Sequence, residues 1–85
     1  MSKDEQLFAQ LVYLFHATAM QALGKIKNPV TEKIDRNLEQ AEQSIDMLNM
    51  LKARTANNLS ANEQRLLEMT LSELRLNFVD EKAKG

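Results

Sequence analysis

Apolar residues recur at helical spacing along residues 7–23, where two parallel seams follow alternating steps of four and three. The seams lie side by side, and together they cover about half of the circumference of the predicted helix at roughly 100° per residue. One neighbouring helix cannot cover that much surface, so we expect this helix to contact two partners. The first seam consists of Leu7, Leu11, Leu14 and Thr18, and the second seam of Phe8, Val12, Phe15, Ala19 and Leu23.

Capping signals place the ends of this helix. Ser2 and Glu5 have the spacing of a capping box, in which each side chain bonds the backbone amide of the other residue. Gly24 suits the left-handed position that closes a helix. We therefore predict a helix over about 3–23.

An irregular loop over 24–36 should follow, because Pro29 excludes helical conformation from the residue before it. Asp35 and Asn37 are both reasonable caps for a second helix, which we predict over about 38–55. The apolar stripe of that helix consists of Leu38, Ala41, Ile45 and Leu48.

A third helix is predicted over about 61–79, because Ser60 and Glu63 repeat the capping-box spacing. Asn57 tolerates the left-handed conformation that ends the preceding helix. The short link between the two helices forces them into an antiparallel hairpin. The charged tail 80–85 lacks apolar anchors, so we expect it to fray. The stripe of the third helix consists of Leu67, Thr70, Leu71, Leu74 and Phe78.

The fold class that follows is an all-α, three-helix antiparallel bundle in one domain spanning 1–85. The helices at 38–55 and 61–79 form the hairpin, and the helix at 3–23 packs across it through one seam. An 85-residue chain is near the lower limit for an independent core, so burial of the other seam between two copies should add stability. We expect a symmetric homodimer.

Charge and composition exclude several settings. Lys plus Arg number 11 and Asp plus Glu number 12, which leaves no field strong enough to recruit nucleic acid or anionic lipid, so nucleic-acid binding is disfavoured but not excluded. Cysteine is absent, so disulfides and thiolate metal sites are excluded. The first residues carry two acids and no basic cluster, so we expect no secretory signal. The apolar stretch at 7–23 is interrupted by polar residues and too short for a membrane span, which favours a cytoplasmic protein.

Catalytic and metal sites are disfavoured by elimination. His16 is the only histidine, and no Glu-x-x-His pair exists for a di-metal bundle site. Two glycines cannot form a glycine-rich phosphate cradle. The acids Glu39, Glu42 and Asp46 are interpreted as a solvated helix face. We therefore predict no catalytic residue, no cofactor, no metal and no enzymatic activity, with His16 as a partly buried rim residue.

Methionines outside the core stripes indicate a contact surface. Unbranched thioethers adapt to irregular partners, although filling gaps in the core is an equally good interpretation. The two seams of the first helix favour the interface. The predicted interface residues are Leu7, Leu11, Leu14, Met47, Met50, Met69, Arg75 and Leu76.

A resemblance covers most of the chain. Its residues are the run from Ile45 to Leu51, then Thr55, Asn58-Leu59-Ser60, Glu63, Leu66, Leu67, Leu71, Leu74, Arg75, Phe78 and Val79. This pattern resembles a bacterial family of short proteins, domain of unknown function 1844, from about residue 7 to residue 80. The resemblance implies a small, helical, cytoplasmic protein without an assigned activity, and it carries over no catalytic or binding residue. Asp46 and Arg75 lie off both core stripes, so we hypothesise that they pair across subunits or meet a partner.

The function favoured by the sequence is a non-enzymatic protein-interaction or assembly module, which binds a second copy and possible further protein partners of unknown identity. One alternative is a small apolar ligand held between the helices, in a closed cavity lined by Met and Phe. Another is weak nucleic-acid binding through the loop from Lys25 to Arg36, with affinity that falls steeply with salt. The basic residues of that loop are Lys25, Lys27, Lys33 and Arg36.

Overall fold

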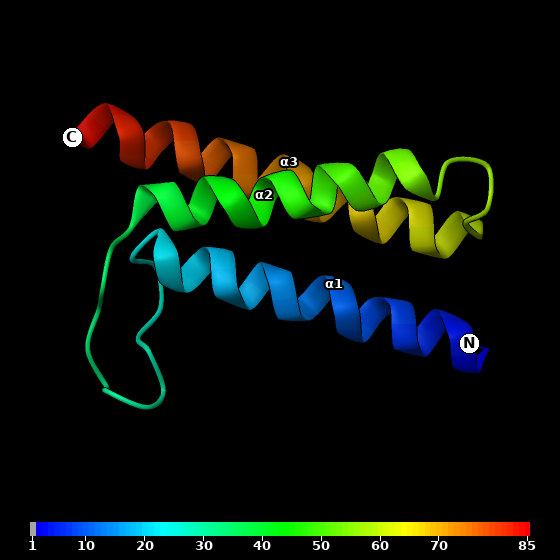
Figure 1. The fold of residues 1–85 in the computed structure, drawn as a ribbon, viewed down its shortest axis with the longest axis horizontal. Coiled ribbons are helices and arrows are strands. Elements are labelled where there is room, and N and C mark those ends of the chain that lie inside the picture. The colour runs from blue at the N-terminus through cyan, green and yellow to red at the C-terminus, as the bar shows by residue number, and fades with distance from the viewer. Residues whose placement is uncertain (1) are drawn as a thin grey trace.

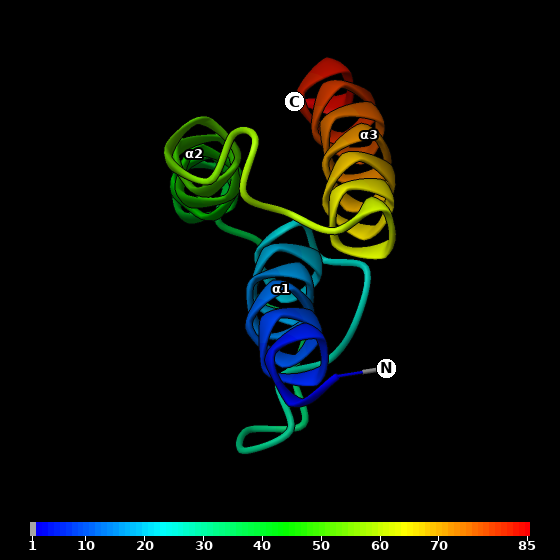
Figure 2. The ribbon, with the colours of Figure 1, turned by 90° about the vertical axis from the view of Figure 1, so that its right-hand side faces the viewer.

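The computed structural model describes residues 2–85 as three α-helices, with no strand in that range. They are α1 (Lys3–Ala22), α2 (Leu38–Arg54) and α3 (Ala61–Lys84). Each helix contacts the other two. α1 and α3 run in the same direction and α2 runs against them (Figure 1). Seen along the helices, the three axes form a triangle (Figure 2), so the predicted all-α antiparallel bundle is confirmed.

The starts of all three helices follow the predicted caps. Both capping boxes form, with each serine side chain accepting from the backbone amide three residues later. Asn37 caps α2 by accepting from the backbone amide of Gln40 at 3.0 Å. The amide of Asn37 itself donates to the carbonyl of Ala22 at 2.7 Å, so the start of α2 also satisfies the end of α1.

α1 ends as the glycine predicts. Gly24 has φ of +78°, and its amide donates to the carbonyl of Gln21 at 3.0 Å. The amide of Lys25 donates to the carbonyl of Met20 at 3.0 Å, which completes a Schellman motif. Asn57, after α2, also adopts the left-handed conformation, with φ of +69°. Local backbone chemistry therefore sets both turns.

The core is formed by the second seam of α1 and the stripes of the hairpin. Val12 of α1 and the cap residue Leu23 just after α1 are 0% exposed, as are Leu48 of α2 and Leu71 of α3. Partly buried side chains of all three helices pack around this centre. The hydrophobic cluster comprises Val12, Ala19, Ala22, Leu23, Ala41, Ile45, Leu48, Leu67, Leu71 and Leu74.

The expectation of a frayed tail at 80–85 is wrong. α3 continues to Lys84, five residues beyond the predicted end at 79. Glu81 is buried within this last part of the helix and forms ion pairs with Lys25 and Arg36. These contacts tie the end of α3 to the loop between α1 and α2, which replaces the apolar anchors that the tail lacks.

Candidate interaction surfaces

The first seam of α1 is exposed in the single chain. Leu7, Leu11 and Leu14 are 50%, 40% and 62% exposed, whereas Val12 in the second seam is 0% exposed. α1 thus uses one seam for its own bundle and turns the other away from it. The structure confirms that the hairpin covers only part of the apolar surface of α1, and the partner for the rest stays a prediction.

The predicted interface residues on α2 and α3 are exposed as well. Met47 and Met50 on α2 are 43% and 49% exposed, and Met69 and Leu76 on α3 are 65% and 74% exposed. None of these four belongs to the hydrophobic core cluster. The alternative that the methionines fill gaps in the core is therefore not supported for Met47, Met50 or Met69.

The predicted residues do not form one patch. Met69 lines a groove together with Tyr13 and His16, so it lies on the α3 side of α1. At roughly 100° per residue, Tyr13 and Leu11 are about 160° apart around α1. The first seam and Met69 therefore face different flanks of the bundle, and one partner helix cannot cover both.

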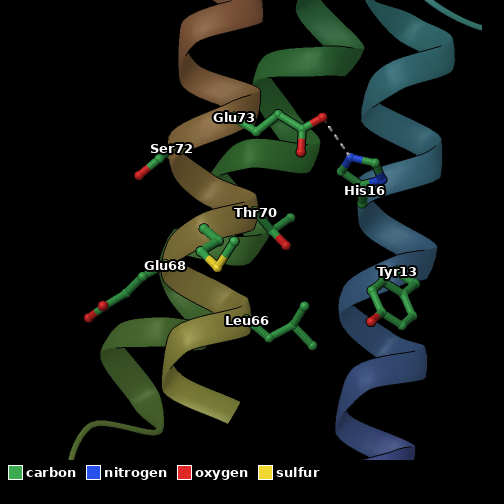
Figure 3. A pocket seen from close by; sticks show the side chains of 8 residues that line it. Tyr13, His16, Leu66, Glu68, Thr70, Ser72 and Glu73 are labelled. Carbon is green, nitrogen blue, oxygen red and sulfur yellow. Dashed lines mark hydrogen bonds and ion pairs between the residues drawn. The ribbon is translucent and has the colours of Figure 1, made fainter. Parts of the chain in front are cut away.

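A groove with a volume of about 570 Å³ lies between α1 and α3. Tyr13 and His16 reach it from α1 and Leu66 from α3, while Ser72 points away from α1 (Figure 3). The groove is open and mainly apolar. It is not the enclosed cavity lined by Met and Phe that a ligand in the bundle core would require.

His16 lines this groove and is partly buried, as predicted. Its side chain is 31% exposed, and Nε2 lies 3.4 Å from Oε1 of Glu73 (Figure 3). The pair links α1 to α3. No group of three or more potential ligand side chains in residues 2–85 is arranged to hold a metal ion.

Arg75 has a partner inside the chain. Its Nη2 donates to Oδ1 of Asn49, so the guanidinium bridges α3 to α2. This contact explains a side chain that lies off the core stripe of α3. Asp46 is exposed on α2 beside Glu42 and Glu39. Contact of Arg75 or Asp46 with a second molecule stays a prediction.

Glu81 is the centre of a polar cluster that the sequence analysis missed. Oε2 of Glu81 lies 2.7 Å from Nζ of Lys25 and 3.0 Å from Nζ of Lys84, and Oε1 lies 3.3 Å from Nε of Arg36. The hydrogen bonds from Lys25 and then Lys84 lower the pKa of Glu81 to about 2. Its spacing gave a signal, because position 81 continues the alternating steps of the α3 stripe through Leu74 and Phe78.

The same cluster uses two of the four basic residues of the loop. Lys25 and Arg36 are bound to Glu81, and Arg36 also donates to the backbone carbonyls of Glu81 and Gly85. The other two basic residues of the loop, Lys27 and Lys33, are exposed and do not pair with Glu81. The loop therefore presents a weaker positive charge than its sequence indicates.

The helical fold agrees with the family resemblance. Residues 5–81 match the family described as domain of unknown function (DUF1844). The chain belongs to this family. No curated protein and no solved structure matches the chain. The DUF1844 match covers all of α2 and most of α1 and α3, so it includes both exposed flanks. None of the helices within residues 2–85 combines the length and apolar character that a membrane span requires.

Proposed function

We propose that this DUF1844 protein is a non-enzymatic interaction module of the bacterial cytoplasm that assembles as a homodimer through the first seam of α1. The observation that carries the proposal is the row of Leu7, Leu11 and Leu14, which are 50%, 40% and 62% exposed along one face of a regular helix. Large aliphatic side chains aligned on one side of a helix are typical of a contact surface.

The small apolar area of the first seam limits the free energy that it can contribute to dimerisation by itself. Full burial of a leucine contributes roughly 1.5–3 kcal/mol, so a half-exposed leucine contributes about 1 kcal/mol. Six such leucines across a twofold axis contribute roughly 6 kcal/mol in total. Association itself costs roughly 4–15 kcal/mol, so the seam supports a dimer only with help from neighbouring surface. Exposed Met47 on the adjacent helix α2 is one source of such surface.

The test is a double substitution in the seam. Leu11→Glu with Leu14→Glu places charges on the face that would be buried between copies, and neither residue belongs to the core cluster. We expect wild type to sediment as a dimer at micromolar concentration and the variant to sediment as a monomer with unchanged helix content by circular dichroism. Met69→Glu is the matched control, because that side chain is 65% exposed on another flank. If the seam variant kept the oligomeric state of wild type, the assignment of the interface to the first seam would be wrong. If wild type were monomeric, the homodimer itself would be refuted.

Neither alternative function gains support from a specific contact. A ligand in the core needs an enclosed cavity, whereas the groove between α1 and α3 is open. Nucleic-acid binding needs free cations, whereas Lys25 and Arg36 are engaged by Glu81. An apolar probe that raises the melting temperature, or an affinity for single-stranded DNA that falls steeply with salt, would reverse this order.

A further inference from the structure

The loop between α1 and α2 projects past α1 on the side opposite α2 and α3 (Figures 1 and 2). It presents three large aliphatic side chains to solvent. Ile26, Val30 and Ile34 are 42%, 89% and 57% exposed. Exposed aliphatic side chains gathered on one projecting loop indicate a contact surface, since loops on a rigid scaffold commonly carry binding residues.

The tip of the loop is an ordered turn. Oδ1 of Asn28 accepts from the amides of Val30 at 2.8 Å and Thr31 at 3.4 Å. The amide of Asn28 donates to the carbonyl of Lys33 at 2.9 Å, and the amide of Glu32 donates to the carbonyl of Asn28 at 2.7 Å. These bonds hold the turn in one conformation. A side chain on a preorganised turn loses less conformational entropy on binding than one on a flexible loop.

The base of the loop is held to the bundle from both ends. Lys25 at the start and Arg36 at the end both pair with Glu81 of α3, at 2.7 Å and 3.3 Å. A Cβ at Gly24 would lie 3.5 Å from side-chain atoms of Ile34 and Arg36, so the end of the loop packs against its beginning. The loop is therefore fixed in direction, and we refer to residues 25–36 as the arm.

The arm and the first seam face the same side of the molecule. Leu14 and Leu7 lie on the surface of α1 roughly opposite the buried Val12 and Ala19. The arm extends in that same direction from the C-terminal end of α1 (Figures 1 and 2). The first seam of α1 and the arm together form a corner. Leu7, Leu11 and Leu14 lie on one side of it, and Ile26, Val30 and Ile34 lie on the other.

We propose that this corner binds a second copy of the chain, with the α1 helices antiparallel about a twofold axis near Leu14 and each arm packed on the N-terminal part of the partner's α1. The proposal rests on the homodimer proposed above and specifies its geometry. Leu14 is the most exposed residue of the seam, at 62%. With the axis at Leu14, Gly24 at the base of the arm lies opposite position 4 of the other copy. Leu7 of that copy is then the seam residue nearest to the arm.

Other registers bring less of the corner onto the partner's α1. Residues that face each other across an antiparallel twofold have numbers that add up to twice the number at the axis. An axis at Leu11 would place Gly24 beyond the start of the partner's helix, which begins at Lys3. The arm would then project into solvent. An axis near Leu14 is the register that brings both apolar sides of the corner onto one partner.

Charge and area are consistent with a second copy. Asp4 in the first turn of α1 is exposed on the same face as Leu11, and the arm carries exposed Lys27 and Lys33. Glu32 and Asp35 on the arm reduce this attraction, so apolar contact contributes most of the binding free energy. The arm raises the number of large exposed aliphatic residues on this side from three to six. A standard interface of about 800 Å² per partner would cover about one seventh of the 5906 Å² surface.

Cysteine cross-linking tests the register, because the chain contains no cysteine of its own. Disulfides form where two Cα atoms lie within about 4.4–6.8 Å. We expect Leu14→Cys to give a disulfide-linked dimer and Leu7→Cys alone to give none. A mixture of Leu7→Cys and Val30→Cys chains should give the mixed dimer. Leu76→Cys mixed with Val30→Cys is the control, since Leu76 is 74% exposed on α3, away from the corner. Equal cross-linking in the control would overturn the proposal.

A charge substitution in the arm separates this proposal from the homodimer itself. Val30→Glu with Ile34→Glu lies outside the core cluster, so helix content should be unchanged. We expect the dimer Kd from sedimentation equilibrium to rise at least about tenfold. If the arm variant keeps the Kd of wild type while Leu11→Glu with Leu14→Glu is monomeric, the arm proposal fails and the homodimer stands. If the seam variant stays dimeric or wild type is monomeric, both proposals fail.

Discussion

Ser60 donates its hydroxyl hydrogen to Oε2 of Glu5 at 2.9 Å, which joins the start of α3 to the start of α1. Both residues already serve in capping boxes, Glu5 with Ser2 and Ser60 with Glu63. The hydrogen bond from Ser60 is the main cause that lowers the pKa of Glu5. Two local caps are thereby coupled, and they align the parallel helices of the bundle at one end.

Removal of this hydroxyl should destabilise the fold. Ser60→Ala leaves the amide of Glu63 without its cap and removes one of the donors to Glu5, which costs about 1 kcal/mol. For a domain of this size we expect the melting temperature to fall by about 4–8 °C. Thermal unfolding followed by circular dichroism at fixed protein concentration measures the shift. Ser72→Ala, in the exposed interior of α3, is the control and should leave Tm unchanged or slightly higher. Equal effects of both substitutions would contradict the coupling of the caps.

Acid should weaken the bundle through Glu81. The pKa of Glu81 is lowered from 4.5 to about 2 in the folded chain, mainly by the hydrogen bond from Lys25. A group whose pKa is lower in the folded state contributes stability above its unfolded pKa, and that stability is lost as pH falls. We expect stability to decline between about pH 5 and pH 2, and Glu81→Gln to reduce this decline. Urea unfolding across that pH range is the measurement.

The matched control for that series is Glu42→Gln, which replaces an exposed carboxylate on α2. It should leave the dependence of stability on pH close to that of wild type. If Glu42→Gln flattened the curve as much as Glu81→Gln, the cluster around Glu81 would not be the source of the acid sensitivity.

Gly24 should resist substitution for a conformational reason. Its φ is +78°, and a Cβ there would meet neighbours at an ordinary 3.5 Å, so Gly24→Ala suffers from backbone strain without a clash. We expect a loss of about 1–2 kcal/mol in the free energy of unfolding, measured with urea. Gly85→Ala provides the comparison, because Gly85 also has positive φ, of +85°, but has nothing within 4 Å at the chain end. A neutral Gly24→Ala would show that the loop adopts another path.

Leu71 should account for a large share of core stability. It is 0% exposed at the centre of α3, so Leu71→Ala removes packing and leaves a cavity. We expect a loss of about 3 kcal/mol in the free energy of unfolding. Leu76→Ala on the same helix removes the same atoms from a side chain that is 74% exposed, and its effect in the monomer should stay within about 0.5 kcal/mol. Comparable losses would mean that the outer face of α3 is covered in solution.

The sequence by itself predicted the features that depend on near neighbours. Ser2 with Glu5 and Ser60 with Glu63 act within one helical turn, so the two capping boxes are visible from residue identity and spacing. The left-handed Gly24 is equally local. Helical periodicity separated the two seams of α1, and the structure buries one of them at Val12.

Other features depended on which helix flank meets which neighbour. The seam of α1 predicts an interface at Leu7, Leu11 and Leu14, and positions off the core stripes of α2 and α3 predict the other five residues. Only the packing shows that Leu11 and Met69 face different flanks. The spacing of Arg75 indicates no packing role, because its partner Asn49 lies on another helix. The spacing of apolar residues in one helix does not show how the neighbouring helix is rotated about its own axis.

The end of α3 shows most clearly which features the sequence determines and which depend on the packing of the helices. Sequence alone determined three amphipathic helices, their caps and the apolar positions that must be buried, because these depend on steric and hydrogen-bonding effects within a few residues. Only the tertiary structure decided that α3 continues to Lys84, that Glu81 is buried, and that the arm lies on the same side as the first seam. Glu81 meets Lys25 and Arg36 across about 50 positions of sequence. Such a pairing exists only once the helices have packed.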